Sequence, residues 1–237
     1  MSLRKTSLVD YPGKVAATLF FPGCNLRCPW CHNRDLVLRE KAPGTDLVSL
    51  AEALSHIEKR RAVLGGVVLS GGEPCLFTGL ADLIRHIKQM GLAAKLDTNG
   101  MVPQVLARLF QDEAARPDYI ALDLKLAPER YGELLSGRAT MANPGEALKK
   151  SADLIRTSGI THEFRSLALP NGFFGPADIE ALIPLAGNGT WHIRTFRPGN
   201  CLDPAWDELP GTGRGEAEAL ERMAREIRDI AKPGNTV

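Results

Sequence analysis

No stretch of this 237-residue chain contains the roughly 20 consecutive apolar residues that a bilayer-spanning helix needs. The N-terminus also lacks the charged and then apolar pattern of a secretory signal, so we expect a cytoplasmic protein without a membrane partner. Acidic and basic residues nearly cancel, leaving a formal net charge of +1, and this balance does not indicate a nucleic-acid partner. Function must therefore be inferred from local motifs.

Cysteine is scarce, and the five cysteines of the chain are unevenly distributed. Cys24, Cys28 and Cys31 form a C-x3-C-x2-C row, which argues against a disulfide framework and for a reducing compartment. A [4Fe-4S] cluster in electron transfer normally takes four cysteines. Three thiolates can hold three irons and leave the fourth open to a ligand, so the row predicts a site for chemistry.

This cysteine row resembles that of the radical S-adenosylmethionine (SAM) superfamily. The resemblance implies one [4Fe-4S] cluster, whose open iron chelates the amino and carboxylate groups of SAM. It also implies that Trp30 and His32, which flank the cluster, wall the adenine side. Two other interpretations are open: ordinary buried cysteines, and a structural zinc site, for which His32 directly after Cys31 is awkwardly placed.

Short apolar runs rich in β-branched or aromatic residues alternate with stretches of helical periodicity. Six such units predict an α/β fold whose parallel strands form an incomplete barrel. The resemblance implies the same fold, a partial (β/α)6 TIM barrel of the radical SAM type. We expect one radical SAM domain over residues 1–237, with a strap at 1–14, the barrel at 15–197 and a C-terminal loop and helix at 198–237. The predicted strands are Val15–Phe21, Val67–Ser70, Ala93–Asp97, Tyr119–Leu124, His162–Leu169 and Trp191–Phe196; the predicted helices are Leu47–Leu64, Gly79–Met90, Val102–Gln111, Pro144–Thr157, Pro176–Ala186 and Gly215–Ala231; loops are expected at Arg39–Asp46 and Gly199–Gly215.

Three consecutive predicted strands end in polar motifs: Ser-Gly-Gly-Glu-Pro at 70–74, Asp-Thr-Asn-Gly at 97–100 and Asp-Leu-Lys at 123–125. Ligands of parallel α/β folds lie at the carboxyl ends of the strands, so the three motifs should share one mouth. The paired glycines would let backbone approach a ligand closely. Taken alone, the first motif is an ordinary turn, and the aspartates of the other two could cap helices.

The same three motifs resemble the GGEP, DTNG and DLK motifs of the activating enzymes for glycyl radical enzymes, a branch of the radical SAM superfamily. The resemblance implies that Asp97, Thr98 and Asp123 can also enclose a monovalent cation near the SAM carboxylate. Arg165 corresponds to a strand arginine of this branch, whereas Arg197 aligns only loosely with its relatives. The residues implied to bind SAM are Gly71, Gly72, Glu73, Pro74, Asp97, Thr98, Asn99, Asp123, Lys125, Arg165 and Arg197.

Two further segments, Thr6–Lys14 and the run Cys-His-Asn-Arg-Asp at 31–35, narrow the resemblance to activators of anaerobic ribonucleotide reductase and pyruvate formate-lyase. The resemblance implies an oxidoreductase that reductively cleaves SAM to a 5′-deoxyadenosyl radical. This radical would abstract a hydrogen atom from a glycine of a partner glycyl radical enzyme, with anaerobic ribonucleotide reductase as the expected partner. Because the chain has no additional cysteine-rich segment, we expect electrons from flavodoxin or ferredoxin.

Some features fall outside this pattern. Cys75 and Cys201 have no counterpart in the motifs, and we interpret both as structural. Hydrogen-atom abstraction needs no protein general base, so no Ser-His-Asp set is expected and no histidine is given a catalytic role. The alternatives are a radical SAM enzyme acting on a small molecule or peptide, an activator of another glycyl radical enzyme such as pyruvate formate-lyase, and an Fe–S electron carrier without catalysis.

Overall fold

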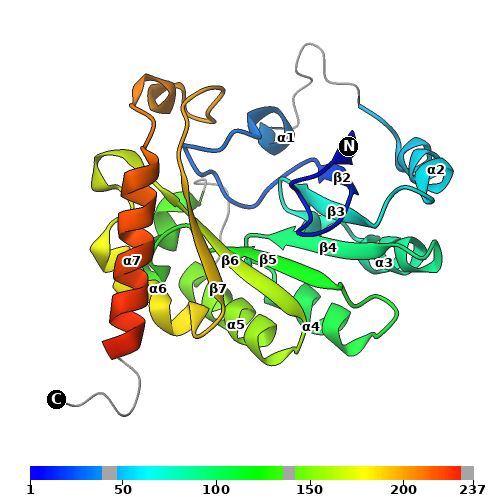
Figure 1. The fold of residues 1–237 in the computed structure, drawn as a ribbon. Helices are drawn as coiled ribbons and strands as arrows, with labels where there is room; N and C mark the ends of the chain where they lie inside the picture. The colour runs from blue at the N-terminus through cyan, green and yellow to red at the C-terminus, as the bar shows by residue number, and fades with distance from the viewer. Residues whose placement is uncertain (39–46, 136–141, 231–237) are drawn as a thin grey trace.

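The computed structural model of the protein describes residues 1–38, 47–135 and 142–230. Its centre is a seven-stranded sheet in which the strands follow chain order, with β2 to β7 parallel and β1 antiparallel to β2 (Figure 1). The sheet does not close on itself, because β1 and β7 form its two edges. The strands are β1 (Ser2–Ser7), β2 (Ala16–Phe21), β3 (Gly66–Gly71), β4 (Ala93–Thr98), β5 (Tyr119–Asp123), β6 (Thr161–Ala168) and β7 (Thr190–Thr195).

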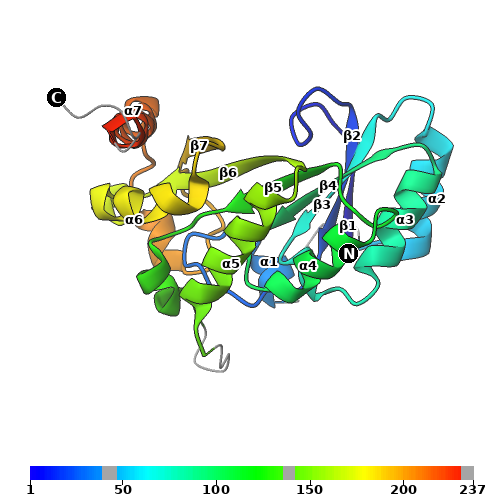
Figure 2. The same cartoon turned by 90° about the horizontal axis from the view of Figure 1, so that it is seen from below.

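Helices α3 to α6 pack along one face of the sheet, and the main hydrophobic core lies between the two layers (Figure 2). This arrangement is the expected α/β architecture of an incomplete barrel. The α-helices are α1 (Arg34–Leu38), α2 (Leu50–Arg60), α3 (Leu80–Gln89), α4 (Pro103–Gln111), α5 (Pro144–Thr157), α6 (Pro176–Ala186) and α7 (Arg214–Ile230), and short 3₁₀ helices span Pro74–Leu76, Pro128–Leu134, Pro170–Gly172 and Pro204–Glu208.

The six predicted strands and six predicted helices all exist, and every predicted strand boundary is within one residue of the observed one. The largest helix error is α2, which is shorter than the predicted Leu47–Leu64. Its start is fixed at Ser49, whose hydroxyl accepts a hydrogen bond from the Glu52 backbone while the Glu52 carboxylate accepts one from the Ser49 backbone. This capping box satisfies amide groups that would otherwise lack partners at the first turn.

Besides the short 3₁₀ helices, two elements of the described chain were not predicted from the sequence, β1 and α1. Strand β1 occupies the N-terminal strap and pairs with β2, and its middle residues are exposed, so it lacks the apolar alternation that marks a half-buried strand. Helix α1 is only five residues long. The predicted loop at Arg39–Asp46 and the last residue of the final predicted helix, Ala231, lie outside the described residues. The predicted loop at 199–215 contains the 3₁₀ helix Pro204–Glu208.

Edge strand β7 is covered by α7, which packs against β7 and α6. The Glu221 carboxylate of α7 accepts a hydrogen bond of 3.0 Å from the backbone N–H of Ile193. An edge strand with free backbone donors can pair with other chains, and a covering helix with a carboxylate acceptor prevents this. Among the helices that the structure describes, none combines the length and apolar character needed to span a bilayer.

Candidate active site

A cavity of about 310 Å³ opens where the carboxyl ends of the parallel strands meet the loop that follows β2. Its volume is at the lower end of the roughly 300–1,000 Å³ typical of ligand pockets. The cysteine row and the three strand-end motifs therefore share one mouth. The predicted site residues that line the cavity are Cys24, Cys28, Trp30, Cys31, His32, Gly71, Gly72, Asp97, Thr98, Asn99, Asp123, Lys125 and Arg165.

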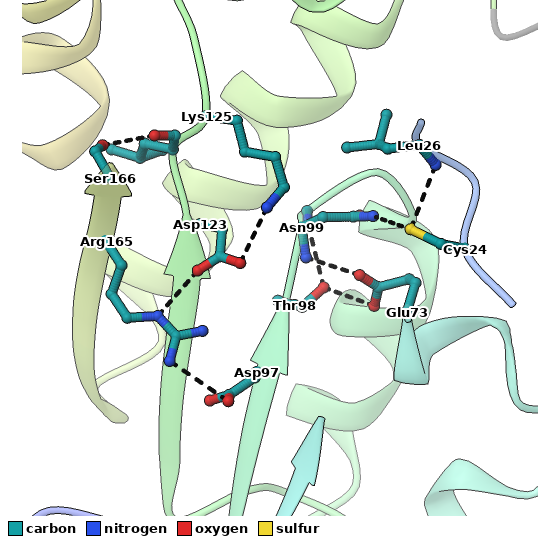
Figure 3. A network of polar contacts seen from close by, with 12 residues as sticks. Cys24, Leu26, Glu73, Asp97, Thr98, Asn99, Asp123, Lys125, Arg165 and Ser166 are labelled. Atoms are coloured by element: carbon teal, nitrogen blue, oxygen red, sulfur yellow. Dashed lines mark hydrogen bonds and ion pairs between the residues drawn. The ribbon is translucent and has the colours of Figure 1, made fainter. Parts of the chain in front are cut away.

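The three cysteines of the row are free thiols. Cys24 Sγ accepts hydrogen bonds from the Leu26 backbone at 3.4 Å and from the Asn99 side-chain amide at 3.6 Å (Figure 3). Burial raises the pKa of the Cys28 thiol to about 12 and also raises the pKa of Cys24. The metal-free protein consequently holds these two groups as thiols, and a metal centre must displace their protons in order to bind.

Over the part of the chain that is described, no three His, Cys, Asp or Glu side chains converge closely enough to hold one metal ion. An iron–sulfur cluster makes a different demand, because each thiolate binds a different iron and the sulfurs need not meet at one point. Three free thiols facing one cavity, with amide donors directed at Cys24, fit such a cluster.

The paired glycines line the cavity and also allow two segments of backbone to pack closely against each other. A Cβ on Gly72 would lie 2.0 Å from the carbonyl oxygen of Gly23, and one on Gly71 would lie 2.4 Å from the backbone nitrogen of Phe21. Gly71 also has φ of +113°, which residues with side chains rarely adopt. The glycines thus hold the cysteine loop against the end of β3.

Glu73 and Pro74 do not line the cavity, contrary to prediction. The Glu73 side chain is 1% exposed, and its carboxylate accepts hydrogen bonds from Thr98 Oγ1 and from the backbone of Cys75 and Asn99. Burial raises the pKa of Glu73, although these donors oppose the shift. With its acceptor sites taken by the protein, Glu73 joins the loops after β3 and β4, while Pro74 begins a buried 3₁₀ turn.

Four charged side chains form a chain of contacts along the cavity wall (Figure 3). Arg165 lies between two carboxylates, with Nε 2.9 Å from Asp123 Oδ1 and a terminal nitrogen 3.4 Å from Asp97 Oδ2. Lys125 Nζ lies 3.2 Å from Asp123 Oδ2. Burial alone would raise the pKa of Asp123, but the two cations outweigh it and hold that pKa well below its usual value. The pKa values of Lys125 and Arg165 are raised because their carboxylate partners outweigh the effect of burial.

Asp97, Thr98 and Asp123, the residues predicted to hold a monovalent cation, all line this cavity. Thr98 Oγ1 donates to Glu73, and both aspartates are already paired with lysine or arginine side chains. The charges of the two carboxylates are thus compensated by lysine and arginine side chains.

Trp30 borders the cavity but is only 4% exposed. Its ring packs against Trp206 and Phe173, with centroid separations of 5.1 and 5.6 Å. The carbonyl oxygen of Pro29 accepts a 3.0 Å hydrogen bond from the backbone of Asp203. The segment after β7 therefore braces the cysteine loop.

His32 and Arg197 differ from their predicted roles in one respect. His32 lines the cavity, and its Nε2 lies 2.6 Å from the Arg197 carbonyl oxygen. The Arg197 side chain is exposed and does not line the cavity, so only its backbone contributes. Arg194, three residues earlier on β7, lines the cavity instead. Arg194 was expected from the sequence to reach the adenosine end of SAM together with Arg197, and the alternation along β7 places it on the inner face.

Residues 18–170 match the family described as the Radical SAM superfamily. This match extends over more than half of the chain, and the protein belongs to the radical SAM superfamily. Membership implies a [4Fe-4S] cluster and SAM, and the three cavity-lining thiols are consistent with that implication.

One such relative is a protein of Methanocaldococcus jannaschii that is provisionally named a glycyl-radical enzyme activating enzyme. It is 29% identical over 225 residues, which cover 94% of this chain and 90% of the relative. The pyruvate formate-lyase-activating enzyme of Clostridium pasteurianum is 36% identical, and pyruvate formate-lyase 1-activating enzyme of Escherichia coli K12 is 33% identical. These two matches cover 58% and 57% of this chain and 56% and 55% of the relatives, so they span about half the length of each activating enzyme.

Solved structures support the fold at much lower sequence identity. A radical SAM methyltransferase from Sphaerobacter thermophilus superimposes with a TM-score of 0.63 at 16% identity, covering 91% of this chain and 64% of the methyltransferase. Streptococcus suis SuiB bound to S-adenosylmethionine gives 0.60 at 12% identity, covering 90% of this chain and 47% of SuiB. These similarities agree with the expected partial barrel.

Proposed function

We propose that this protein is a radical SAM activase that generates the radical of a glycyl radical enzyme. The observation that carries the proposal is the cavity in which the cysteine row meets the Asp-Thr-Asn-Gly and Asp-Leu-Lys motifs. The similarity to the Methanocaldococcus jannaschii protein over 94% of the chain supports the same activity.

When bound, the reduced cluster would supply one electron and SAM would supply a 5′-deoxyadenosyl group that takes the hydrogen atom from the glycine Cα. The products would be 5′-deoxyadenosine and methionine. The protein's own residues then have distinct tasks. Cys24, Cys28 and Cys31 hold the cluster, and the Arg165 and Lys125 cations favour the SAM carboxylate on the cavity wall. Trp30, packed in its aromatic cluster, excludes water from the cluster side.

We propose a protein partner because the sheet stays open between β1 and β7, which leaves a side from which a glycine-bearing loop can enter. Anaerobic ribonucleotide reductase is the partner that the strap at Thr6–Lys14 and the run at 31–35 favour. The pyruvate formate-lyase-activating relatives make pyruvate formate-lyase a second candidate. Flavodoxin or ferredoxin is the proposed electron donor.

The direct test is to incubate the reconstituted, reduced protein with SAM and each candidate partner without oxygen, and to record electron paramagnetic resonance spectra. We expect the doublet of a glycyl radical on the reductase. Cys28→Ala should give neither cluster absorbance nor the doublet. Absence of the doublet with every glycyl radical enzyme of the same organism would refute the proposal, and SAM turnover with a small molecule alone would favour the alternative activity.

A further inference from the structure

A fully buried lysine lies behind the cavity wall, outside every motif described above. Lys95 is on β4, two residues before Asp97, so the two side chains point to the same face of the sheet. Lys95 is 1% exposed, and its Nζ lies 2.5 Å from Asp97 Oδ1 and 4.0 Å from Glu163 Oε1. It also lies 5.6 Å above the ring of Tyr119. A buried ammonium persists only where such partners compensate its charge.

Lys95 completes a balanced set of charges on the inner face of the sheet. Glu163 is also 4.0 Å from Arg165 and 3.8 Å from His192, and Asp97 accepts a 3.0 Å hydrogen bond from Ser70. The ion pairs that connect to Lys95 join equal numbers of basic side chains (Lys or Arg) and carboxylates (Asp or Glu). The cations are Lys95, Lys125 and Arg165, and the carboxylates are Asp97, Asp123 and Glu163.

We propose that Lys95 is a positioning residue whose fixed ammonium group takes the place of an exchangeable monovalent cation beside Asp97. SAM binding then needs neither potassium nor sodium. This inference rests on the proposed use of SAM, and Lys95 acts through Asp97, since Lys95 itself does not line the cavity.

The argument follows from what removal of the ammonium would leave behind. Without it, Asp97 and Glu163 would share one negative charge too many in a region with little solvent. Such a site attracts a small cation, because an uncompensated buried charge is costly. Lys95→Met removes the charge while keeping an unbranched side chain of similar length. Lys95→Met/Glu163→Gln removes one charge of each sign and restores the balance.

The test measures SAM affinity of the anaerobically reconstituted wild type, Lys95→Met and the double variant by equilibrium dialysis. Each protein is assayed in potassium, sodium and tetramethylammonium chloride at one ionic strength. We expect wild-type affinity to change by less than about twofold among salts, and Lys95→Met to bind about tenfold more weakly in tetramethylammonium than in potassium or sodium. The double variant should return to a dependence below about threefold.

A cation-dependent wild type, or a Lys95→Met protein insensitive to the salt, would overturn the role of Lys95 without affecting the proposed function. The melting temperature of the cluster-free proteins gives an independent readout: potassium should raise it for Lys95→Met only. If the wild-type protein did not bind SAM in any of the three salts, the proposed function would fail. The comparison of melting temperatures would then decide the role of Lys95. Lys95→Gln replaces Lys95→Met in both measurements if the latter does not fold.

Discussion

The two faces of strands β4, β5 and β6 differ sharply in chemistry although their residues alternate along the same backbone. One face belongs to the hydrophobic core that packs against the helices, and the other carries the ion pairs and part of the cavity wall. The core face includes Ala94, Leu96, Ile120, Leu122 and Phe164, and the inner face includes Lys95, Asp97, Asp123, Glu163 and Arg165.

This difference shows how an incomplete barrel combines stability with a binding site. A closed barrel fills its interior with apolar side chains, so both faces of every strand serve packing. Here one face buries apolar area against helices, while the other keeps charged groups that compensate one another and leaves room for a ligand. Substitutions on the two faces should therefore separate folding stability from cofactor binding.

The largest effect is expected on the core face. Phe164 is 0% exposed, and Phe164→Ala should lower the free energy of unfolding by about 3–5 kcal/mol because it leaves a cavity between the sheet and the helices. Phe164→Leu, which retains most of the volume, should cost clearly less. Urea denaturation measures both. If folded Phe164→Ala also lost SAM affinity by more than a few fold, the separation of the two faces would be wrong.

The inner face should respond in the opposite way. Asp123→Asn keeps the shape but removes the carboxylate that holds Arg165 and Lys125 in position at the cavity wall, so SAM affinity should fall by roughly tenfold or more because the two cations lose their alignment. The loss of unfolding free energy should be only about 1 kcal/mol, since Asp123 is partly exposed and solvent screens its ion pairs. Cluster absorbance should be unchanged. A large loss of stability with unaltered SAM affinity would contradict this assignment.

Much of this contrast could be read from the sequence because each signal was local. The strands, the cysteine row and the strand-end aspartates follow from short-range patterns. The rule that ligands of parallel α/β folds lie at the carboxyl ends of the strands predicted that these motifs would lie together. The role of Glu73 was not predictable, since its acceptors are satisfied by residues on the next strand's loop. The spacing of Lys95 and Asp97 alone places them on the same face of β4. The second partner of Lys95, Glu163, could not be predicted in this way because it lies on β6, which is not adjacent to β4.

A pH series sharpens the contrast further. The pKa of Asp123 is lower in the folded protein than in the unfolded chain, where it is about 3.9. Its ion pairs therefore stabilise the fold fully above that value, and the contribution is lost as the pH falls below it. The difference in unfolding free energy between wild type and Asp123→Asn should be constant from about pH 7 to pH 5 and shrink below about pH 4. A difference that grew towards acid pH would show that Asp123 is not held ionised by its neighbours.

The smallest effect tests how far the inner face extends towards the edge of the sheet. Arg194 lines the cavity from β7, whereas Arg197 lies beyond the strand end and contributes its carbonyl oxygen to His32. Arg197→Ala keeps the backbone carbonyl, so it should leave SAM affinity within about twofold of wild type. Arg194→Ala removes a cation near an anionic group of the ligand, so it should weaken SAM binding about three- to tenfold. Both side chains are exposed, so neither change should alter the melting temperature appreciably. Equal affinities for the two variants would mean that the binding face ends at β6, and that the edge strand serves only to carry the segment that braces the cysteine loop.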